Sequence, residues 1–213
     1  MTVEIEDLGR ADYTATLERM RILHARVAGG LEPGRVLLVE HDPVYTAGRA
    51  TPREELGPKV VPIERGGKIT YHGPGQLVIY PIVELPVRDA RDWLRRLERF
   101  GVSVCSAFGI EAKASVDGTG VFCGAHKIAS IGVAIKRWTN LHGIAINVAM
   151  DRSPWFAVRP CGRPPETMSD LSSAVGRPIT LDEVRLAVRE RVEILMAPAQ
   201  ATDRGRSPEA RNP

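Results

Sequence analysis

Five short apolar runs, placed between helical patterns, constrain the fold of this chain most. They are residues 35–41, 76–84, 120–123, 127–135 and 144–149. A short, nearly continuous apolar run is typical of a buried strand, so these runs predict a sheet in the middle of the chain. The run at 76–84 contains Pro81. Because proline donates no hydrogen bond to a ladder, that position predicts an edge strand or a bulge.

Helical patterns flank the strands. They cover residues 12–28, residues 89–108 and a stretch that opens at Thr180. Asp12 can cap the first, since its carboxylate accepts a bond from a free backbone N–H. Thr180 and Glu183 have the spacing of a capping box, whereas Gly101 weakens the second helix. No linker divides the chain, so we expect one folded unit of the α+β class.

Charge and composition exclude several classes of protein. The 213 residues carry 29 basic and 26 acidic side chains, a net charge of +3 that is too mild for a dedicated nucleic-acid binder. No stretch approaches the roughly 20 apolar residues of a membrane-spanning helix, and the N-terminus lacks an apolar signal core. We therefore expect a cytoplasmic protein that binds neither nucleic acid nor membrane.

The sequence also lacks the usual signatures of metal and nucleotide sites. The histidines show no metal-ligand spacing, and three cysteines without a CxxC argue against a zinc site or a disulfide framework. Neither a GxxxxGK[ST] loop nor a strand–GxGxxG–helix unit is present. We expect no cofactor and no metal.

The least ordinary segment is residues 65–76, RGGKITYHGPGQ. Glycine has no Cβ, so such a segment can bring backbone N–H groups close to a ligand. Arg65, Lys68 and His72 add positive and polar groups. The alternative is a glycine-rich turn that leads into the strand at Gln76. The polar residues among the glycines favour a binding loop.

Two further segments are ambiguous from local sequence. Lys127 opens an apolar run, where a desolvated amine could act as a base or pair with an anion. A lysine at a strand end that reaches into water is the interpretation that the local sequence favours. Gly143 precedes a strand, which suggests close approach of the backbone to a neighbour. A turn between two antiparallel strands also explains His142 and Gly143.

Cys161 is the candidate for a reactive thiol. It lies between Arg159 and Arg163, in an irregular electropositive loop where a thiolate would be favoured and accessible. A lone cysteine is more often structural, so the local sequence alone does not favour this role. Cys105 lies on the apolar side of a helical pattern and Cys123 closes an apolar run, so we expect both in the core.

Taken together, these segments resemble the octanoyltransferase family, also called lipoate–protein ligase B. The family motifs are RGGxxTxHxPGQ at residues 65–76, KIAxIGV at 127–133, HGxAxN at 142–147, PCG at 160–162 and EHxPVYTxGR at 40–49. They occur in the family's order, and the likeness covers about residues 3–196. The sequence departs from the usual pattern at Arg163 and at residues 164–166, directly after the PCG motif.

The resemblance implies a fold, an activity and a site. The fold is a mixed β-sheet flanked by helices, like the catalytic domain of biotin and lipoate protein ligases, over residues 1–196. Independently of the resemblance, residues 197–213 lack large apolar side chains, so their composition predicts a disordered tail. Cys161 would carry the acyl group as a thioester, and Lys127 would lower the pKa of its thiol. The acyl substrate would be lined by Arg65, Gly66, Gly67, Lys68, Ile69, Thr70, Tyr71, His72, Ser130, Ile131, Gly132, Gly143, Ile144 and Ala145.

The implied reaction moves an octanoyl or lipoyl group from acyl carrier protein to a lysine of apo lipoyl domains in 2-oxoacid dehydrogenase-type complexes. The oxyanion could be held by backbone N–H groups near Gly162 or Gly75. Arginines could steer the acidic carrier protein, either Arg49, Arg159 and Arg163 or those of residues 88–99, although the latter fit a solvated helix face better.

Three other functions stay open at this point. An ATP-dependent lipoate or biotin ligase would activate the free acid and need no cysteine nucleophile. A non-catalytic module that binds carrier protein or lipoyl domain would keep the basic loop but leave Cys161 unreactive. A thiol hydrolase would release free fatty acid whether or not a lipoyl domain is present.

Overall fold

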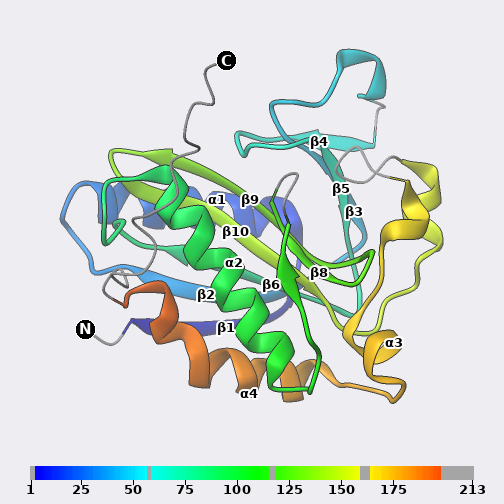
Figure 1. Ribbon diagram of the computed structural model, residues 1–213. Helices are drawn as coiled ribbons and strands as arrows, with labels where there is room; N and C mark the ends of the chain where they lie inside the picture. The colour runs from blue at the N-terminus through cyan, green and yellow to red at the C-terminus, as the bar shows by residue number, and fades with distance from the viewer. Residues whose placement is uncertain (1–2, 57–58, 116–118, 159–163, 198–213) are drawn as a thin grey trace, which may run out of the picture.

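The computed structural model describes residues 3–56, 59–115, 119–158 and 164–197, and its centre is a seven-stranded sheet (Figure 1). In spatial order the strands are β1 (Glu4–Ala11), β2 (Arg35–His41), β6 (Gln76–Ile82), β10 (Thr139–Asn147), β9 (His126–Lys136), β8 (Val121–Cys123) and β7 (Lys113–Ala114). β1 pairs with β2 in parallel, whereas the other neighbours are antiparallel. The predicted mixed sheet of an α+β protein is therefore confirmed.

A three-stranded sheet and several helices complete the architecture. The small sheet has the order β4 (Val60–Pro62), β3 (Val44–Ala47) and β5 (Ile69–His72). The helices are α1 (Tyr13–Ala28), α2 (Ala90–Ser106), α3 (Leu171–Val175) and α4 (Leu181–Arg191), with 3-10 turns at Arg53–Glu55, Ser153–Ala157, Pro165–Thr167 and Val192–Leu195. None of the described helices is long and apolar enough to cross a membrane.

The large sheet is buried on both faces. Successive side chains of a strand point to opposite faces, and β2 shows this clearly. Val36 and Leu38 belong to the core that includes α2 and α4, whereas Leu37 and Val39 belong to the core that includes α1. Figure 1 shows the same layering, with α2 and α4 in front of the sheet and α1 behind it. Two-sided burial explains why the strand sequences are almost continuously apolar.

Pro81 does not mark an edge, because β6 lies in the interior of the sheet between β2 and β10. Regular pairing of β6 with β10 is interrupted after the Ile144–Ile79 pair, two residues before the proline, and resumes where the Asn140 N–H donates to the Val83 carbonyl (2.9 Å). The carbonyl of Pro81 faces β10, where it accepts a hydrogen bond from the Asn140 side chain (2.6 Å). N–H and C=O of a strand residue point the same way, so the missing N–H lies where the regular ladder is interrupted.

Helix α2 lies close against the sheet at Gly101. A Cβ there would lie 2.7 Å from Cγ2 of Val121 and 2.8 Å from Cδ1 of Ile144. The glycine that weakens the helix by propensity therefore permits its packing. Arg96 of the same helix is buried rather than solvated, with Nε 2.5 Å from Oδ2 of Asp92 and Nη1 donating to the Leu195 carbonyl (3.3 Å). This arginine ties α2 to the C-terminal turn and is not available to steer a partner.

Local capping signals correctly located two helix starts. The Asp12 carboxylate accepts from the N–H of Ala15 (2.9 Å) before α1, and Thr180 and Glu183 form the complete capping box of α4. These caps satisfy backbone N–H groups that have no partner within the helix. Capping of α1 fixes the residue that follows, Tyr13, at the start of the helix.

Candidate active site

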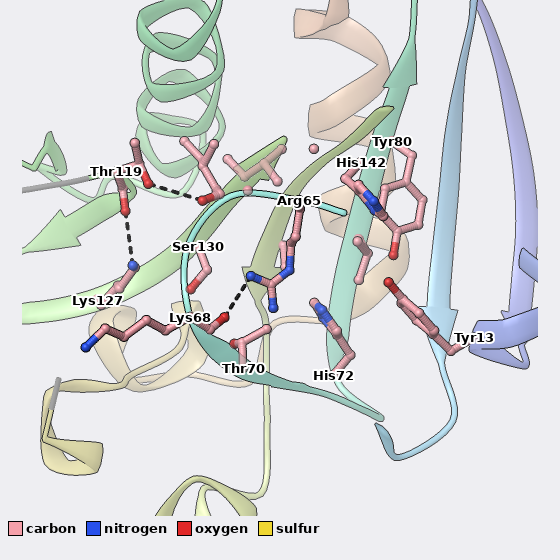
Figure 2. Close-up of a pocket in the computed structure, with 17 residues that line it drawn as sticks. Tyr13, Arg65, Lys68, Thr70, His72, Tyr80, Thr119, Lys127, Ser130 and His142 are labelled. Carbon is pink, nitrogen blue, oxygen red and sulfur yellow. Dashed lines mark hydrogen bonds between the residues drawn. The ribbon is translucent and has the colours of Figure 1, made fainter. Parts of the chain in front are cut away.

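A cavity of about 230 Å³ opens between β5, β6, β9 and β10 and the start of α1. Figure 2 shows Lys127 and Thr119 at one end and Tyr13, Tyr80 and His142 at the other. It is lined by Tyr13, Arg65, Gly67, Lys68, Thr70, His72, Val78, Tyr80, Thr119, Lys127, Ser130, Ile131, Gly132, His142, Gly143, Ile144 and Ala145. Segments that are far apart in the sequence therefore line the same cavity.

All the residues named in advance for the acyl site line this cavity except Gly66, Ile69 and Tyr71. The predicted binding loop in fact contains strand β5, whose side chains alternate between two faces. Thr70 and His72 face the cavity. Tyr71 instead joins Met150, Trp155 and Met168 in a separate apolar cluster, and Ile69 is buried. Because side chains of a strand alternate between its two faces, Ile69 and Tyr71 point away from the cavity that Thr70 and His72 line.

Lys127 is buried at one end of the cavity, so the expectation of a lysine that reaches into water is wrong. Its side chain is only 3% exposed, and Nζ donates to the carbonyl of Thr119 (3.0 Å). The ammonium lies 5.7 Å from the ring centroid of Phe122, within the range of a cation–π contact. A buried, hydrogen-bonded ammonium beside a cavity can stabilise an anion brought to it.

The backbone of Lys127 contacts the chain that follows the predicted nucleophile. Cys161 itself lies outside the described residues, as do Arg159, Gly162 and Arg163. The description resumes at Pro164, and Met168 forms a parallel bridge with Lys127. The N–H of Ser169 donates to the Lys127 carbonyl (3.0 Å).

The other two cysteines differ in their surroundings. Cys105 of α2 is fully buried in the core, and this burial raises the pKa of its thiol to about 12. A thiol in that state is protonated at neutral pH and is a poor nucleophile. Cys123 at the end of β8 is only half-buried and packs against this core from its edge, so its predicted burial is confirmed only in part.

Arg65 organises the glycine-rich segment through hydrogen bonds to oxygen atoms of the protein. Nη1 donates to the carbonyls of Gly66 (3.0 Å) and Lys68 (2.8 Å), and Nη2 donates to the carbonyl and hydroxyl oxygens of Thr46 (both 2.9 Å). A Cβ on Gly132 would lie 2.8 Å from Cδ of this arginine. The guanidinium therefore joins β3, β9 and the segment before β5, and sets the shape of the cavity wall.

A chain of buried side chains connects the cavity floor to the segment beside Lys127. His72 Nδ1 lies 2.7 Å from Oε1 of Gln76, so that nitrogen carries the proton. Gln76 Nε2 donates to Oδ1 of Asn147 (2.9 Å), whose Nδ2 donates to the Ser169 carbonyl (2.8 Å). Burial lowers the pKa of His72 to about 3, so its ring is neutral. These polar groups are satisfied by one another and rigidify the site.

The aromatic end of the cavity was not predicted as part of the site. His41 Nε2 lies 2.9 Å from the Tyr80 hydroxyl, and the His41 ring contacts Tyr13 edge-on at 5.0 Å between centroids. Tyr13 and Tyr80 both line the cavity. Both residues lie outside the family motifs, so only the three-dimensional fold shows that they belong to the site.

His142 shows that the segment at residues 142–147 is not a turn. It lies within β10 with a left-handed φ of 66°, which a residue with a side chain rarely adopts. The ring is buried, its Nε2 lies 3.7 Å from Oε2 of Glu64, and neither ring nitrogen has a hydrogen-bond partner among the described residues. Burial lowers the pKa of His142, and Glu64 opposes that shift. The His142 ring and Arg21 hold the pKa of Glu64 well below its ordinary range.

Gly143 confirms the expected close approach of backbone, since a Cβ there would lie 2.7 Å from Cδ of Pro81 and closer still to the Ile79 carbonyl oxygen. Gly75 is not a free oxyanion donor, because its N–H donates to Oε1 of Glu40 (2.8 Å). Among the described residues, no group of three or more His, Cys, Asp or Glu side chains could hold a metal ion.

Comparison with solved structures places the fold in a known class. A lipoate-protein ligase A bound with ATP superposes with a TM-score of 0.73 at 17% identity, over 92% of this chain and 86% of that one. A biotin protein ligase from Aquifex aeolicus superposes with a TM-score of 0.53 at 16% identity, over 92% and 69% of the chains. The fold is thus that of the lipoate and biotin protein ligase catalytic domains, as predicted.

Sequence comparison is more specific. The family described as the lipoyl protein ligase A/B catalytic domain matches residues 12–193. An octanoyltransferase of Geobacter metallireducens is 41% identical over 90% of this chain and 92% of its own length, and one of Acidothermus cellulolyticus is 43% identical over 96% and 97%. The chain therefore belongs to the lipoyl protein ligase A/B catalytic-domain family, on its octanoyltransferase branch.

Proposed function

We propose that this chain transfers an octanoyl group from acyl carrier protein to a lysine of a lipoyl domain, through a thioester on Cys161. The observation that carries the proposal is the burial of Lys127 at the end of the cavity, with its backbone bonded to the chain that returns from residue 161. Relatives that match this chain over most of their length are named octanoyltransferases, which supports both the identity of the acyl group and the class of reaction.

The chemistry requires a nucleophile that is also a good leaving group. The Cys161 thiolate attacks the carbonyl carbon of the octanoyl thioester, and the carrier leaves as a thiolate that takes up a proton. The amine of the acceptor lysine then attacks the acyl-enzyme. The C–S bond breaks, an amide forms, and the amine's proton is passed to a base while the Cys161 thiolate is regenerated. Two successive displacements predict ping-pong kinetics.

Lys127 would serve both half-reactions. As an ammonium it stabilises the thiolate of Cys161, since a free thiol has a pKa of about 8.5 and is mostly protonated at neutral pH. Once neutral, its amine can take the proton that the attacking lysine must lose. Its hydrogen bond to the Thr119 carbonyl keeps the amine at that end of the cavity.

The acyl chain would lie along the cavity towards Tyr13 and Tyr80. Apolar contacts are available from Val78, Ile131 and Ile144, which line the cavity. Burying an eight-carbon chain contributes several kcal/mol, at about 0.8 kcal/mol for each CH₂ group. The aromatic side chains at that end would set the preferred chain length.

One incubation separates this function from its rivals. The protein is mixed with octanoyl carrier protein, with and without apo lipoyl domain, and every species is weighed by mass spectrometry. We expect an octanoyl adduct on Cys161 that disappears when lipoyl domain is added, with matching octanoylation of the domain. A requirement for ATP and free octanoate would indicate a ligase. Release of free octanoate at a rate unaffected by lipoyl domain would indicate a hydrolase, and absence of any adduct or product would indicate a binding module.

A further inference from the structure

The peptide group between Thr119 and Gly120 is held at both of its polar ends. Its carbonyl accepts the hydrogen bond from Nζ of Lys127 (3.0 Å). Its N–H donates to Oε1 of Glu98 (3.4 Å), a residue of α2. A single peptide unit therefore links a carboxylate on the helix to the amine at the end of the cavity.

This peptide lies directly against the lysine side chain. Gly120 has a φ of 139°, and a Cβ there would lie 2.6 Å from Cε of Lys127 and 2.7 Å from the Ala129 carbonyl oxygen. The Thr119 hydroxyl donates to the Ile131 carbonyl (3.2 Å), which fastens the other side of the peptide to β9. Only a glycine in this conformation lets the backbone pass so close to the lysine.

Glu98 is an unusual residue for this position. Its side chain is only 9% exposed, and it does not line the cavity. Burying a carboxylate is costly unless charged or hydrogen-bonded groups offset it. Burial raises the pKa of Glu98, and the Gly120 N–H, Arg95 and Lys127 act against that shift. The groups that favour the ionised carboxylate are therefore those of the site, together with one arginine of the same helix.

We propose that Glu98 is a positioning residue that fixes the Thr119–Gly120 peptide, so that the Thr119 carbonyl holds the Lys127 amine at the end of the cavity. Glu98 does not touch the substrate and acts through the peptide. An N–H bound to a carboxylate also polarises its peptide group, which strengthens the carbonyl as an acceptor for the ammonium. The consequence for acyl transfer rests on the function proposed above, whereas the constraint on Lys127 does not.

The test compares Glu98→Ala with Glu98→Gln. Alanine removes the acceptor for the Gly120 N–H, whereas the glutamine carbonyl can still accept that bond. Glu183→Ala serves as the matched control, because it breaks the capping box of α4 and destabilises the fold away from the site. Trace labelling with acetic anhydride, followed by mass spectrometry of peptides, measures the reactivity of Lys127 relative to the exposed Lys59 and Lys136. The octanoyl transfer rate and KM are measured on the same preparations.

We expect Lys127 labelling to rise about fivefold in E98A, the factor that corresponds to one lost hydrogen bond, and to stay within about twofold of the parent in E98Q. The kcat of transfer should fall about tenfold in E98A with KM unchanged, because a displaced catalytic group slows the chemical step without changing the substrate contacts. E98Q should recover most of the rate, and E183A should change neither labelling nor kcat.

Unchanged Lys127 labelling in E98A would overturn the proposal. An increase in E183A as large as that in E98A would overturn it too, because it would indicate a general loss of stability. Equal defects in E98A and E98Q would also overturn it, since the hydrogen bond would then not be the cause. The proposed function fails separately, if the parent protein forms no adduct on Cys161. In that case labelling still decides whether Glu98 holds Lys127.

Discussion

The glycine at position 143 offers the most quantitative test of how the cavity is built. Gly143→Ala places a methyl group against the Ile79 carbonyl oxygen and 2.7 Å from Cδ of Pro81. Both obstacles belong to β6, in backbone or a proline ring, and cannot rotate away. Overpacking of this kind costs about 1–3 kcal/mol, and rigid neighbours place this site at the upper end. We therefore expect a loss of about 3 kcal/mol in unfolding free energy.

A loss of that size corresponds to a fall of about 6–12 °C in the unfolding midpoint for a chain of this length. Differential scanning calorimetry and urea unfolding measure it. Gly66→Ala is the matched control, because its Cβ would meet only the Val133 carbonyl oxygen, at 3.8 Å, and its midpoint should move by no more than about 1 °C. A midpoint for G143A equal to that of G66A would refute the close approach of β10 to β6.

Two further predictions concern charge at the site. Lys127→Ala should slow alkylation of Cys161 by iodoacetamide at neutral pH about tenfold or more, because the thiolate loses its cationic partner. Mass spectrometry measures the alkylation rate, and an unchanged rate would show that Lys127 does not stabilise the thiolate. His72, with its pKa lowered to about 3 by burial, should make the fold less stable in acid. Its contribution is fully present above the unfolded pKa of 6.5 and is lost as the pH falls towards 3, with a slope of up to about 1.4 kcal/mol per pH unit. In His72→Asn, the unfolding free energy measured with urea should depend less steeply on pH between pH 6.5 and 5, by that slope. A pH dependence parallel to the parent's would contradict the burial of His72.

Features with local causes were predictable from the sequence. The start of α1 at Asp12 and the capping box of α4 depend on residues within one helical turn, and both are present. The apolar runs that became β2, β6 and β9 were recognisable because burial on both faces leaves no polar alternation. β1 escaped notice because its sequence, EIEDLGRA, is polar and becomes a strand only through parallel pairing with β2.

Features that depend on distant partners were predicted poorly. The interior place of Pro81 depends on where the pairing of β10 with β6 is interrupted, which no local pattern encodes. Lys127 is buried because the peptide at Thr119 folds over it, and a strand-end lysine gives no sign of this. The division of β5 into cavity-facing Thr70 and core-facing Tyr71 follows from strand alternation, which the glycines on either side concealed.

The central claim is that an acyl group is carried on one sulfur atom during transfer. Intact-protein and peptide mass spectrometry after brief mixing with octanoyl carrier protein tests it most directly. The account predicts one octanoyl adduct on the peptide that contains Cys161, absent from Cys161→Ser and discharged by apo lipoyl domain. An adduct of normal yield in C161S, or octanoylated lipoyl domain formed by that variant at the parent's rate, would contradict it.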